Sequence, residues 1–589
     1  MRIAVLIRDR CQSKRCSLEC IRYCPPVRTG KEAVVMGEDD KAIISEELCV
    51  GCGICVHKCP FDAIRIIGLP EELEEDLVHQ YGENGFRLYR LPCPRSGMVV
   101  GLLGPNGIGK TTVLSILSGE IIPNLGDYDE EPNWEDVLEA FSGSELYDYF
   151  EKVSTGEWKS SVKPQYVDKL SKVYKGKVST LLKKVDHQSN LSEIRDQLEL
   201  SSFIDKDISK LSGGELQRVA IAATILKEAD VYFFDEPSSY LDIYQRLQVA
   251  KSVQKLAEEK PTVVVEHDLA VFDFLATNVH LMYGSEGAYG VLAHPRPVRT
   301  SINVYLSGFM REENVRFRET EIKFESHPPR KEWSKATLLR FEPLKKRFKS
   351  FILNTGEGSI GVGEVVGVVG PNATGKTTFV KMLAGEIKPT AGEVSTEVTV
   401  SYKPQYLESK FKGTVRELYM TEILEEFESN YFQSEILKSL AVVPHLEREL
   451  NSLSGGELQR VAIALCLGRK ADLYLIDEPS AYLDSNQRMQ AAKTIRRSME
   501  KRGLSGLIVD HDVYFLDLVS DSLMVFGGEP GVTGTGEGPF GMREGMNRFL
   551  KMVEITFRRD NDTNRPRRNK FGSSLDREQK SKGEYYYSA

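Results

Sequence analysis

Eight of the ten cysteines in this 589-residue chain lie before residue 60, in two groups of four. The spacing is C-x4-C-x3-C-x3-C in the first group and C-x2-C-x2-C-x3-C in the second, and a proline follows each group. Thiolates at such spacings hold [4Fe-4S] clusters, so two groups predict two clusters. The predicted ligands are Cys11, Cys16, Cys20 and Cys24, and Cys49, Cys52, Cys55 and Cys59.

The order of the two groups predicts how the clusters share their ligands. In ferredoxins with two clusters, the fourth cysteine of each run ligates the cluster of the other run. This rule places Cys24 with the second group and Cys59 with the first. Two zinc sites are the alternative, because paired Cys-x2-Cys motifs also suit zinc, but two runs that each end in Cys-Pro favour iron–sulfur clusters. We expect Cys93 and Cys466 to be ordinary packed residues.

Two glycine-rich segments can hold a nucleotide. Residues 104–111 read GPNGIGKT and residues 370–377 read GPNATGKT; each follows an apolar run and precedes a helical pattern. In such a loop the backbone N–H groups surround phosphate oxygens, the lysine reaches the β and γ phosphates, and the next hydroxyl binds Mg²⁺. The predicted residues are Gly104, Asn106, Gly107, Gly109, Lys110, Thr111 and Thr112, and Gly370, Asn372, Gly375, Lys376, Thr377 and Thr378.

Further motifs occur twice, which indicates two copies of one module. KPQY begins at residues 163 and 403, LSGGELQR at 211 and 453, and DEPS at 235 and 477. Histidines follow in VEHD and VDHD, at His267 and His511. From P-loop lysine to KPQY glutamine the first copy spans 55 residues and the second 29, so the first carries 26 extra residues.

These motifs resemble those of the ATP-binding-cassette superfamily, each present twice over roughly residues 76 to 530. Asp235 and Asp477 end apolar strands at the carboxyl edge of a parallel sheet, where open α/β folds bind ligands, and there they can assist Mg²⁺. Glu236 and Glu478 would polarise the attacking water, and His267 and His511 would touch the γ-phosphate. The implied Mg²⁺ ligands are Thr111, Gln165, Thr377 and Gln405.

LSGGELQR opens a helix with serine as its N-cap, which makes a second anion site in each module. The head-to-tail pairing of the superfamily implies one ATP between Lys110 and Ser454, and another between Lys376 and Ser212. The signature residues are Ser212, Gly213, Gly214 and Glu215, and Ser454, Gly455, Gly456 and Glu457. Candidates for stacking on adenine are Tyr81 and Phe86 in the first site and Phe351 in the second; core packing is the alternative for each.

Over essentially the whole chain, two such modules behind an eight-cysteine domain resemble the subfamily E ATPases, or RNase L inhibitor family, which split ribosomes for recycling. The implied architecture is α/β: a ferredoxin-like [4Fe-4S] domain plus two P-loop ABC-type nucleotide-binding domains in head-to-tail pairing. The implied cofactors are two [4Fe-4S] clusters, ATP and Mg²⁺. The implied partners are the ribosome, with its small subunit and rRNA, and a release-factor-like protein.

The surplus in the first module predicts a helix-loop-helix over residues 133–153. Apolar residues recur with helical period on both sides of Ser142-Gly143-Ser144, and the family presses such an insert on the small ribosomal subunit. Residues 127–151 hold ten acids and no Lys or Arg, which suits phosphates poorly. Contact would run through the polar tip, aromatic residues or a ribosomal protein; a surface hairpin without a partner is the alternative.

The segments that join and follow the modules contain Pro, Gly and Arg but little periodicity. In the family they form a two-part hinge whose basic residues face rRNA. We expect the C-terminal tail to be partly disordered, with its arginines exposed. The arginines are Arg558, Arg559, Arg565, Arg567 and Arg568, and the expected boundaries are 1–75 for the cluster domain, 76–287 and 326–530 for the ATPase domains, 288–325 for the hinge and 531–589 for the hinge and tail.

Composition agrees with a globular protein outside the membrane. The chain has 77 basic and 86 acidic residues, a net charge of −9, and no run of 18 apolar residues. No secretory signal is visible at the start, so we expect a cytoplasmic monomer without a membrane partner. The clusters would stiffen a small domain that the ATP-driven modules swing. An ATP-gated electron-transfer protein and the ATPase subunit of a membrane transporter remain alternatives.

Overall fold

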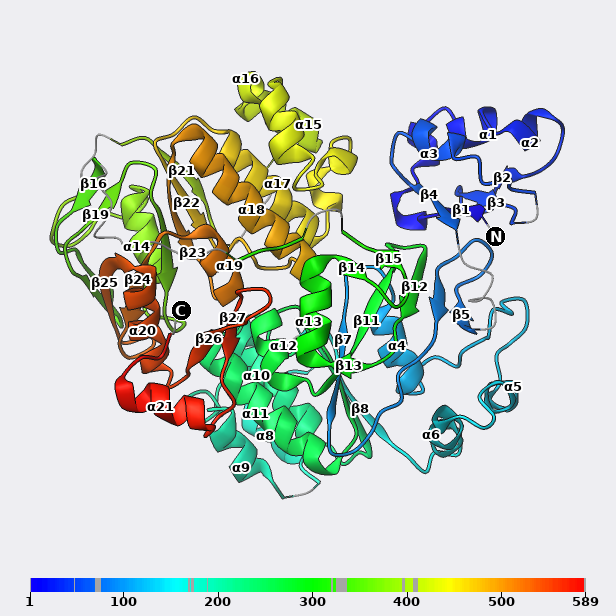
Figure 1. The fold of residues 1–589 in the computed structure, drawn as a ribbon, viewed down its shortest axis with the longest axis horizontal. Coiled ribbons are helices and arrows are strands. Elements are labelled where there is room, and N and C mark those ends of the chain that lie inside the picture. Colours follow the sequence, from blue (N-terminus) through cyan, green and yellow to red (C-terminus); the bar gives the residue numbers. More distant parts are fainter. Residues whose placement is uncertain are drawn as a thin grey trace. The chain divides into compact units, whose positions relative to one another are not determined.

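The computed structural model describes most of the chain and divides it into two compact units (Figure 1). Unit 1 comprises Met1–Pro237, Gln248–His267 and Leu275–Glu319; unit 2 comprises Ser238–Leu247, Asp268–Phe274 and Thr320–Ala589. Two short segments of the first ATPase module therefore pack with the second. The described residues are all except 1, 47, 69–75, 168–169, 171–173, 188, 319–320, 325–335, 395–397, 406–410 and 587–589.

The cysteine domain is built on two short antiparallel ladders with helices between them. Strand β1 (Arg2–Leu6) pairs with β4 (Ile64–Gly68), and β2 (Val34–Met36) pairs with β3 (Ala42–Ile44). The helices are short: α1 (Glu19–Arg22), α2 (Pro25–Arg28) and α3 (Ile54–Lys58). The buried apolar side chains are few, and the cysteines pack around them. A core of this size is too small to stabilise a domain well without a further constraint such as metal ligation.

The first ATPase module is centred on one mixed sheet in the order β5-β6-β12-β11-β7-β10-β9-β8, with β13 beside β11. Strands β11, β7, β10, β9 and β8 run parallel, and β7 and β9 are buried along their whole length, as expected between two helical layers. The strands are β5 (Leu77–Gln80), β6 (Arg87–Tyr89), β7 (Val99–Leu103), β8 (Ser160–Lys163), β9 (Val231–Asp235), β10 (Thr262–Val265), β11 (Asn278–Ser285), β12 (Tyr289–Leu292) and β13 (Arg296–Pro297).

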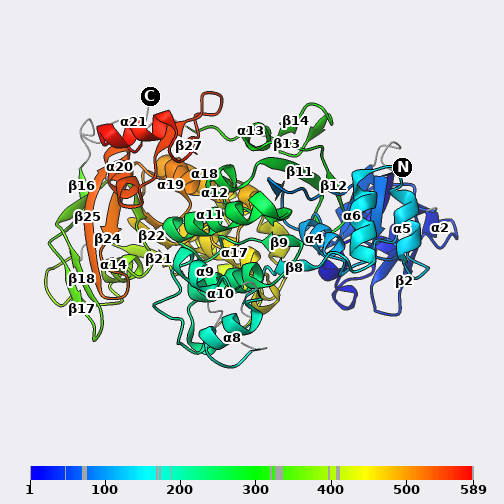
Figure 2. The same ribbon diagram turned by 90° about the horizontal axis from the view of Figure 1, so that it is seen from below.

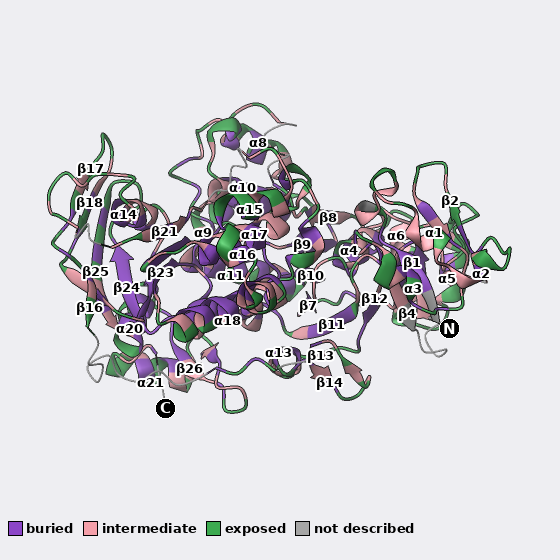
Figure 3. Cartoon of the chain, turned by 90° about the horizontal axis from the view of Figure 1, so that it is seen from above, coloured by how far each residue is buried: buried purple, intermediate pink, exposed green. Residues whose placement is uncertain are grey.

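The second module repeats this order strand for strand. Its sheet runs β17-β18-β25-β24-β20-β23-β22-β21, and Figure 3 shows the burial of β24. The predicted repeat is therefore confirmed in space. The strands are β17 (Lys345–Arg347), β18 (Ile352–Thr355), β20 (Val365–Val369), β21 (Val400–Lys403), β22 (Leu473–Asp477), β23 (Ser505–Val509), β24 (Ser522–Gly527) and β25 (Thr533–Gly541), with a separate pair β16 (Thr337–Phe341) and β19 (Gly358–Gly361).

Helices of matching position cover both sheets. In the first module they are α4 (Lys110–Leu117), α8 (Val178–Val185), α9 (Leu191–Gln197), α10 (Gly213–Leu226), α11 (Ile243–Glu259), α12 (Leu269–Leu275) and α13 (Val298–Ser307), which β14 (Phe309–Met310) and β15 (Val315–Arg316) follow. In the second they are α14 (Lys376–Leu383), α15 (Val415–Glu422), α16 (Leu424–Phe427), α17 (Gly455–Gly468), α18 (Ser485–Arg502), α19 (Val513–Val519) and α20 (Met542–Met552). None of the helices in the described ranges is both long and apolar enough to cross a bilayer.

The predicted helix-loop-helix is present as α5 (Trp134–Ala140) and α6 (Glu145–Ser154), which lie side by side in Figure 2. The Asn133 side chain caps α5 by accepting from the backbone N–H of Asp136 at 2.9 Å. Val137, Tyr149 and Phe150 are buried in the same cluster as residues of β7 and α4. The apolar face therefore joins the core of the first module. All ten acidic residues between positions 127 and 151 are exposed.

The C-terminal tail corrects the prediction of partial disorder with exposed arginines. Residues 557–582 form β26 (Phe557–Arg559), β27 (Pro566–Arg568) and α21 (Ser574–Lys582). The Arg565 side chain is fully buried; it donates to Asp273 Oδ2 at 3.3 Å and to the Tyr514 hydroxyl. Arg559 forms a two-bonded ion pair with buried Asp517. Charge pattern alone missed these carboxylates, which are brought by α12 and α19.

The buried Arg565 pair yields a stability prediction. Replacing Arg565 by alanine should destabilise unit 2 by about 3–5 kcal/mol, because Asp273 keeps a buried charge with fewer partners. Thermal unfolding followed by circular dichroism measures the change. Arg577→Ala on the exposed face of α21 is the matched control, expected to stay within about 0.5 kcal/mol of wild type. Equal stability of the two variants would contradict a structural role for the tail ion pairs.

Candidate functional site

Both P-loops lie between a buried strand and a helix, as predicted: β7 leads into α4, and β20 leads into α14. The glycine before each lysine has a left-handed backbone, with φ of 90° at Gly109 and 95° at Gly375. A Cβ at Gly109 would lie 2.6 Å from the ring of Phe86, and one at Gly375 would lie 3.0 Å from Phe351. Only glycine therefore fits, and the loop backbone stays open to phosphate.

The P-loop lysines are held inside their own loops. Lys110 Nζ donates to the carbonyls of Gly104 at 2.9 Å and Pro105 at 2.6 Å, and Lys376 Nζ makes the same two bonds to Gly370 and Pro371. Burial lowers the pKa of Lys376 to about 8. Burial disfavours the charged form of this lysine, and an anionic phosphate beside the ammonium group would favour it again.

The strand-ending aspartates meet the hydroxyls that follow the P-loop lysines. Thr111 Oγ1 donates to Asp235 Oδ2 at 2.9 Å. Burial, together with the adjacent Glu478 carboxylate, raises the pKa of Asp477 to about 6, although the Thr377 hydroxyl opposes this. Neither buried oxygen of Asp477 accepts a hydrogen bond of ordinary geometry from a described residue. A hydroxyl and a buried carboxylate with spare acceptor capacity fit Mg²⁺.

Each predicted catalytic glutamate lies next to the glutamine predicted to bind Mg²⁺ and the histidine predicted to touch the γ-phosphate. Gln165 Nε2 donates to Glu236 Oε1 at 2.6 Å, and Gln405 makes the equivalent bond to Glu478 at 2.6 Å. His267 Nε2 lies 3.5 Å from Glu236, and His511 Nε2 lies 3.6 Å from Glu478.

The environment of Glu478 keeps it ionised. Burial alone would raise the pKa of Glu478, but the His511 imidazole and the Gln405 amide hold it down at about 2. An ionised carboxylate at this position can orient and polarise an attacking water molecule. The geometry thus brings together every residue of the predicted catalytic set within each module.

Three kinds of residue at this edge were not predicted as site residues. The lysines of KPQY, Lys163 and Lys403, are buried and donate to backbone carbonyls at the strand ends. The glutamines of LSGGELQR, Gln217 and Gln459, do the same. Asp242, which follows Leu241 in the loop after β9, accepts from the backbone N–H of Asn372 in the second P-loop at 2.9 Å. Their identical recurrence in both copies of the repeat is the signal that could have found them.

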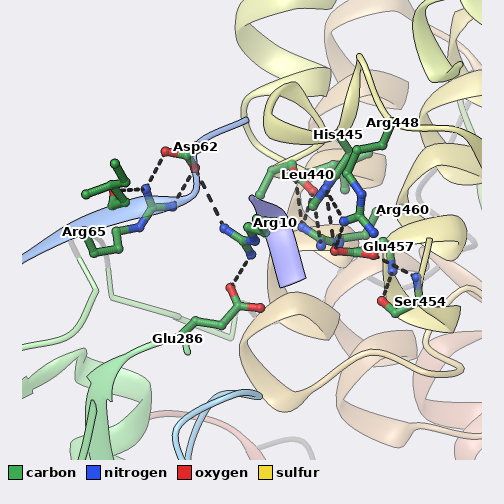
Figure 4. A network of polar contacts seen from close by, with 12 residues as sticks. Arg10, Asp62, Arg65, Glu286, Leu440, His445, Arg448, Ser454, Glu457 and Arg460 are labelled. Carbon is green, nitrogen blue, oxygen red and sulfur yellow. Dashed lines mark hydrogen bonds and ion pairs between the residues drawn. The ribbon is translucent and has the colours of Figure 1, made fainter. Parts of the chain in front are cut away.

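The signature helices begin as predicted, each with a capping box. Ser212 Oγ accepts from the Glu215 N–H, and Ser454 Oγ from the Glu457 N–H, both at 3.3 Å. The two differ in what holds the glutamate. Lys206 donates to Glu215 at 2.9 Å, whereas Glu457 lies 2.8 Å from Arg448 and 3.5 Å from buried His445 (Figure 4).

The aromatic candidates for adenine stacking occupy different environments. Tyr81 is exposed, and its ring centroid lies 6.4 Å from that of Phe86. Phe86 and Phe351 are equivalent, because each packs on the last glycine of its P-loop. The exposed aromatic residue next to Phe351 is Phe348, at a centroid distance of 6.4 Å, and the sequence motifs did not predict it. Stacking by any of these rings stays a prediction.

The eight cysteines line two separate cavities. Their grouping is the one predicted if the fourth cysteine of each run ligates the cluster of the other run. One cavity is lined by Cys11, Cys16, Cys20 and Cys59, and the other by Cys24, Cys49, Cys52 and Cys55. Burial, helped by the neighbouring thiolates, raises the pKa of Cys20 to about 11 and that of Cys55 to about 12. Four sulfurs around each of two hollows fit two [4Fe-4S] clusters, whose iron would stabilise the thiolates that burial disfavours.

The cysteine domain contacts the first P-loop through residues of unit 1. Arg10 donates to Glu286 at 2.8 Å and lies 3.9 Å from Asp62 (Figure 4). Next to Glu286, the Gly287 N–H donates to the carbonyl of Gly107 in the P-loop at 2.8 Å. Buried Asn84 bonds the backbones of Ala4, Leu6 and Ile44. The cluster domain is thus fixed next to one nucleotide loop.

Comparisons with known proteins agree with this geometry. The ABC transporter family model matches residues 93–239 and 353–481. Models described as a possible Fer4-like domain in RNase L inhibitor and as a 4Fe-4S binding domain match residues 1–32 and 42–65. The chain is therefore a twin ABC ATPase that hydrolyses ATP with Mg²⁺ and carries two [4Fe-4S] clusters.

Full-length relatives identify the family. The chain is 53% identical over 591 residues to an uncharacterized ABC transporter ATP-binding protein of Methanocaldococcus jannaschii, covering 100% of this chain and 98% of that one. It is similar to an archaeal ribosome recycling factor, aABCE1, solved with ribosomal stalk protein aP1 (54% identity, TM-score 0.84, 88% of this chain, 100% of that chain). It is also similar to a chain in a model of ribosome-bound archaeal Pelota and ABCE1 (53%, TM-score 0.94, 100% and 99%). The chain belongs to the RNase L inhibitor, or ABCE, family.

The arrangement around the glutamates predicts a separation of binding from hydrolysis. The double variant Glu236→Gln, Glu478→Gln should bind ATP but hydrolyse it about 10²–10⁴-fold more slowly, because the base is lost while the P-loops are intact. Phosphate release and retention of labelled ATP measure the two properties. Glu228→Gln, at an exposed position, is the control. Turnover near that of the control would remove the glutamates from the catalytic role.

The cavity grouping predicts iron content. Cys24→Ser should lose the cluster held with Cys49, Cys52 and Cys55, so iron should fall from about eight to about four atoms per chain. Cys59→Ser should lose the other cluster. ATP hydrolysis without an electron donor should persist in both, and Cys93→Ser should keep its full iron content. Iron and acid-labile sulfide assays on purified protein decide this; full iron in Cys24→Ser would refute the grouping.

Proposed function

We propose that this protein splits ribosomes into subunits after termination, using ATP binding and hydrolysis to move its iron–sulfur domain. The observation that carries the proposal is the full-length similarity, with a TM-score of 0.94, to a chain in ribosome-bound Pelota and ABCE1. Similarity along the whole length includes the cysteine domain and the helix-loop-helix, which an ATPase for another purpose has no reason to share.

The work would come from differential binding. Shared ATP between a P-loop and the opposite signature favours the closed pair of modules, and shifting such an equilibrium from 1:99 to 99:1 requires about 5.5 kcal/mol. Hydrolysis, assigned to Glu236 and Glu478, removes that preference. Within unit 1 the cluster domain is bonded next to the first P-loop through Arg10 and Asn84. In this proposal, a movement of that loop is transmitted to the cluster domain through these bonds.

The clusters act structurally in this proposal. The cysteine domain has a small apolar core, and ligation of eight thiolates would make it stiff enough to transmit force. An ATP-gated electron-transfer protein is the second candidate, and it requires a redox change of the clusters in each ATP cycle. The expected domain boundaries 1–75, 76–287, 288–325, 326–530 and 531–589, and a cytoplasmic location, belong to this proposal.

The surface charges suggest how ribosome contact is divided. The exposed acids of α5 and α6 favour a basic ribosomal protein over rRNA as their partner. The sequence predicted exposed arginines that face rRNA. Arg565 is instead buried and Arg559 is paired, so neither is available to bind rRNA. A release-factor-like protein is proposed as a second partner, since the similar structure holds Pelota together with ABCE1.

Subunit separation on sucrose gradients tests the proposal. Post-termination archaeal ribosomes, a release-factor-like protein, ATP and the wild-type chain should yield free subunits, whereas Cys24→Ser should split fewer while hydrolysing ATP at the wild-type rate. Cys93→Ser is the matched control and should split normally. Ribosomes that stay intact with all wild-type components would refute the function. Equal splitting by Cys24→Ser would refute the mechanical role of the iron–sulfur domain.

A further inference from the structure

Two buried lysines at the nucleotide sites have no role in the chemistry described so far. Lys163 and Lys403 occupy the same position of KPQY in the two modules and are 0% and 1% exposed. Each is the last residue of an edge strand, β8 or β21, in an inward-facing position. A lysine is rarely buried so completely unless its ammonium group is paired.

Both ammonium groups bind the backbone of the catalytic strand. Lys163 Nζ donates to the carbonyl of Asp235 at 2.8 Å and to that of Glu236 at 3.1 Å. Lys403 Nζ donates to the carbonyls of Asp477 at 2.7 Å and Glu478 at 3.4 Å. Parallel pairing makes this possible, because Lys163 lies opposite Phe234, one residue before Asp235.

The glutamates need such support because their backbone is strained. Glu236 and Glu478 have φ of 49° and 47°, in the left-handed region that residues with a Cβ avoid. The Glu236 carbonyl accepts a second bond from Gln217 Nε2 at 2.8 Å, and that of Glu478 from Gln459 at 2.6 Å. On the other side, the Glu236 N–H donates to the Val265 carbonyl at 2.9 Å.

The motif therefore acts on one glutamate from two sides. Lys163 binds its backbone, and Gln165, two residues later, binds its carboxylate at 2.6 Å. Pro164 between them favours an extended conformation at Lys163, which sends the two side chains to the same strand end. The second module repeats the arrangement with Lys403 and Gln405.

We propose that Lys163 and Lys403 are positioning residues for ATP hydrolysis: each holds the catalytic glutamate of its own module in the left-handed conformation that aims the carboxylate. They act through the glutamate and not on ATP. The inference rests on the proposed catalytic role of Glu236 and Glu478, but not on ribosome binding.

The proposal makes a site-specific claim that a general packing role does not. Lys163→Met removes the ammonium group and keeps most of the volume, so it should slow hydrolysis only at the site that uses Glu236. In a Glu478→Gln background, where Glu236 is the working base, the loss should be about 10- to 100-fold, the range expected for a misplaced catalytic group. In a Glu236→Gln background, Lys163→Met should change nothing.

Single-turnover hydrolysis of labelled ATP with enzyme in excess measures all variants on one scale. ATP affinity, the Mg²⁺ concentration that gives half-maximal rate, and the melting temperature should match the parent in each background. Lys159→Met, an exposed lysine just before β8, is the matched control. The mirror experiment pairs Lys403→Met with each background and should give the reverse pattern.

Several results would overturn the inference. Equal losses from Lys163→Met in both backgrounds would indicate a general structural effect, and a shifted Mg²⁺ midpoint would indicate that the lysine acts on the metal site. If Lys163→Met does not fold, Gln217→Leu removes the other donor to the same carbonyl and should show the same background dependence. Wild-type hydrolysis by Glu236→Gln itself would instead refute the catalytic assignment on which the inference rests.

Discussion

Parallel strand pairing is the constraint on which both nucleotide sites depend. In the first module β7, β10, β9 and β8 lie side by side in one direction, so their carboxyl ends share one edge. That edge receives the P-loop from β7, Asp235 and Glu236 from β9, His267 after β10, and the KPQY segment, which begins with the last residue of β8. Residues up to about 160 positions apart in the chain meet there because their strands are in register. The second sheet repeats the order, and with it the whole constellation.

Strain at the glutamates shows how such a site is stabilised. A left-handed glutamate is unfavourable by itself, and it persists because the surrounding bonds over-determine it. Neighbouring strands and the signature helix all supply donors to the same short stretch of backbone. Since Gln217 follows the signature glycines, the helix that carries the signature also contacts the catalytic strand end. That contact fixes the backbone of the glutamate against the first turns of the signature helix.

The two modules share a fold but not every contact. In the second module, Glu457 of the signature is held by Arg448 with His445 nearby, whereas in the first a single exposed lysine holds Glu215. Apart from this difference, the backbone N–H of Asn372 in the second P-loop donates to the carboxylate of Asp242. The Asp242 carboxylate acts against burial in setting the pKa of Lys376. The two signature glutamates therefore have different charged neighbours within one chain.

What the sequence determined by itself was the chemistry and the repeat. The P-loops, strand-end acids, signature caps and eight cysteines are local patterns, and their spacing alone predicted what each of them binds. The helix-loop-helix was predicted from the 3.6-residue period of its apolar residues. Tertiary structure decided the partners of long side chains. Arg565 looked like an exposed tail residue, and it is buried because Asp273 and Tyr514, more than 50 positions away, supply its acceptors. Lys163 and Lys403 looked like ordinary charged residues of a motif. Strand register instead places their ammonium groups within hydrogen-bond distance of the backbone carbonyls of Glu236 and Glu478. A lysine or arginine can be exposed or buried according to the carboxylates and carbonyls that approach it, and that approach is set by packing between distant segments, which no local pattern records.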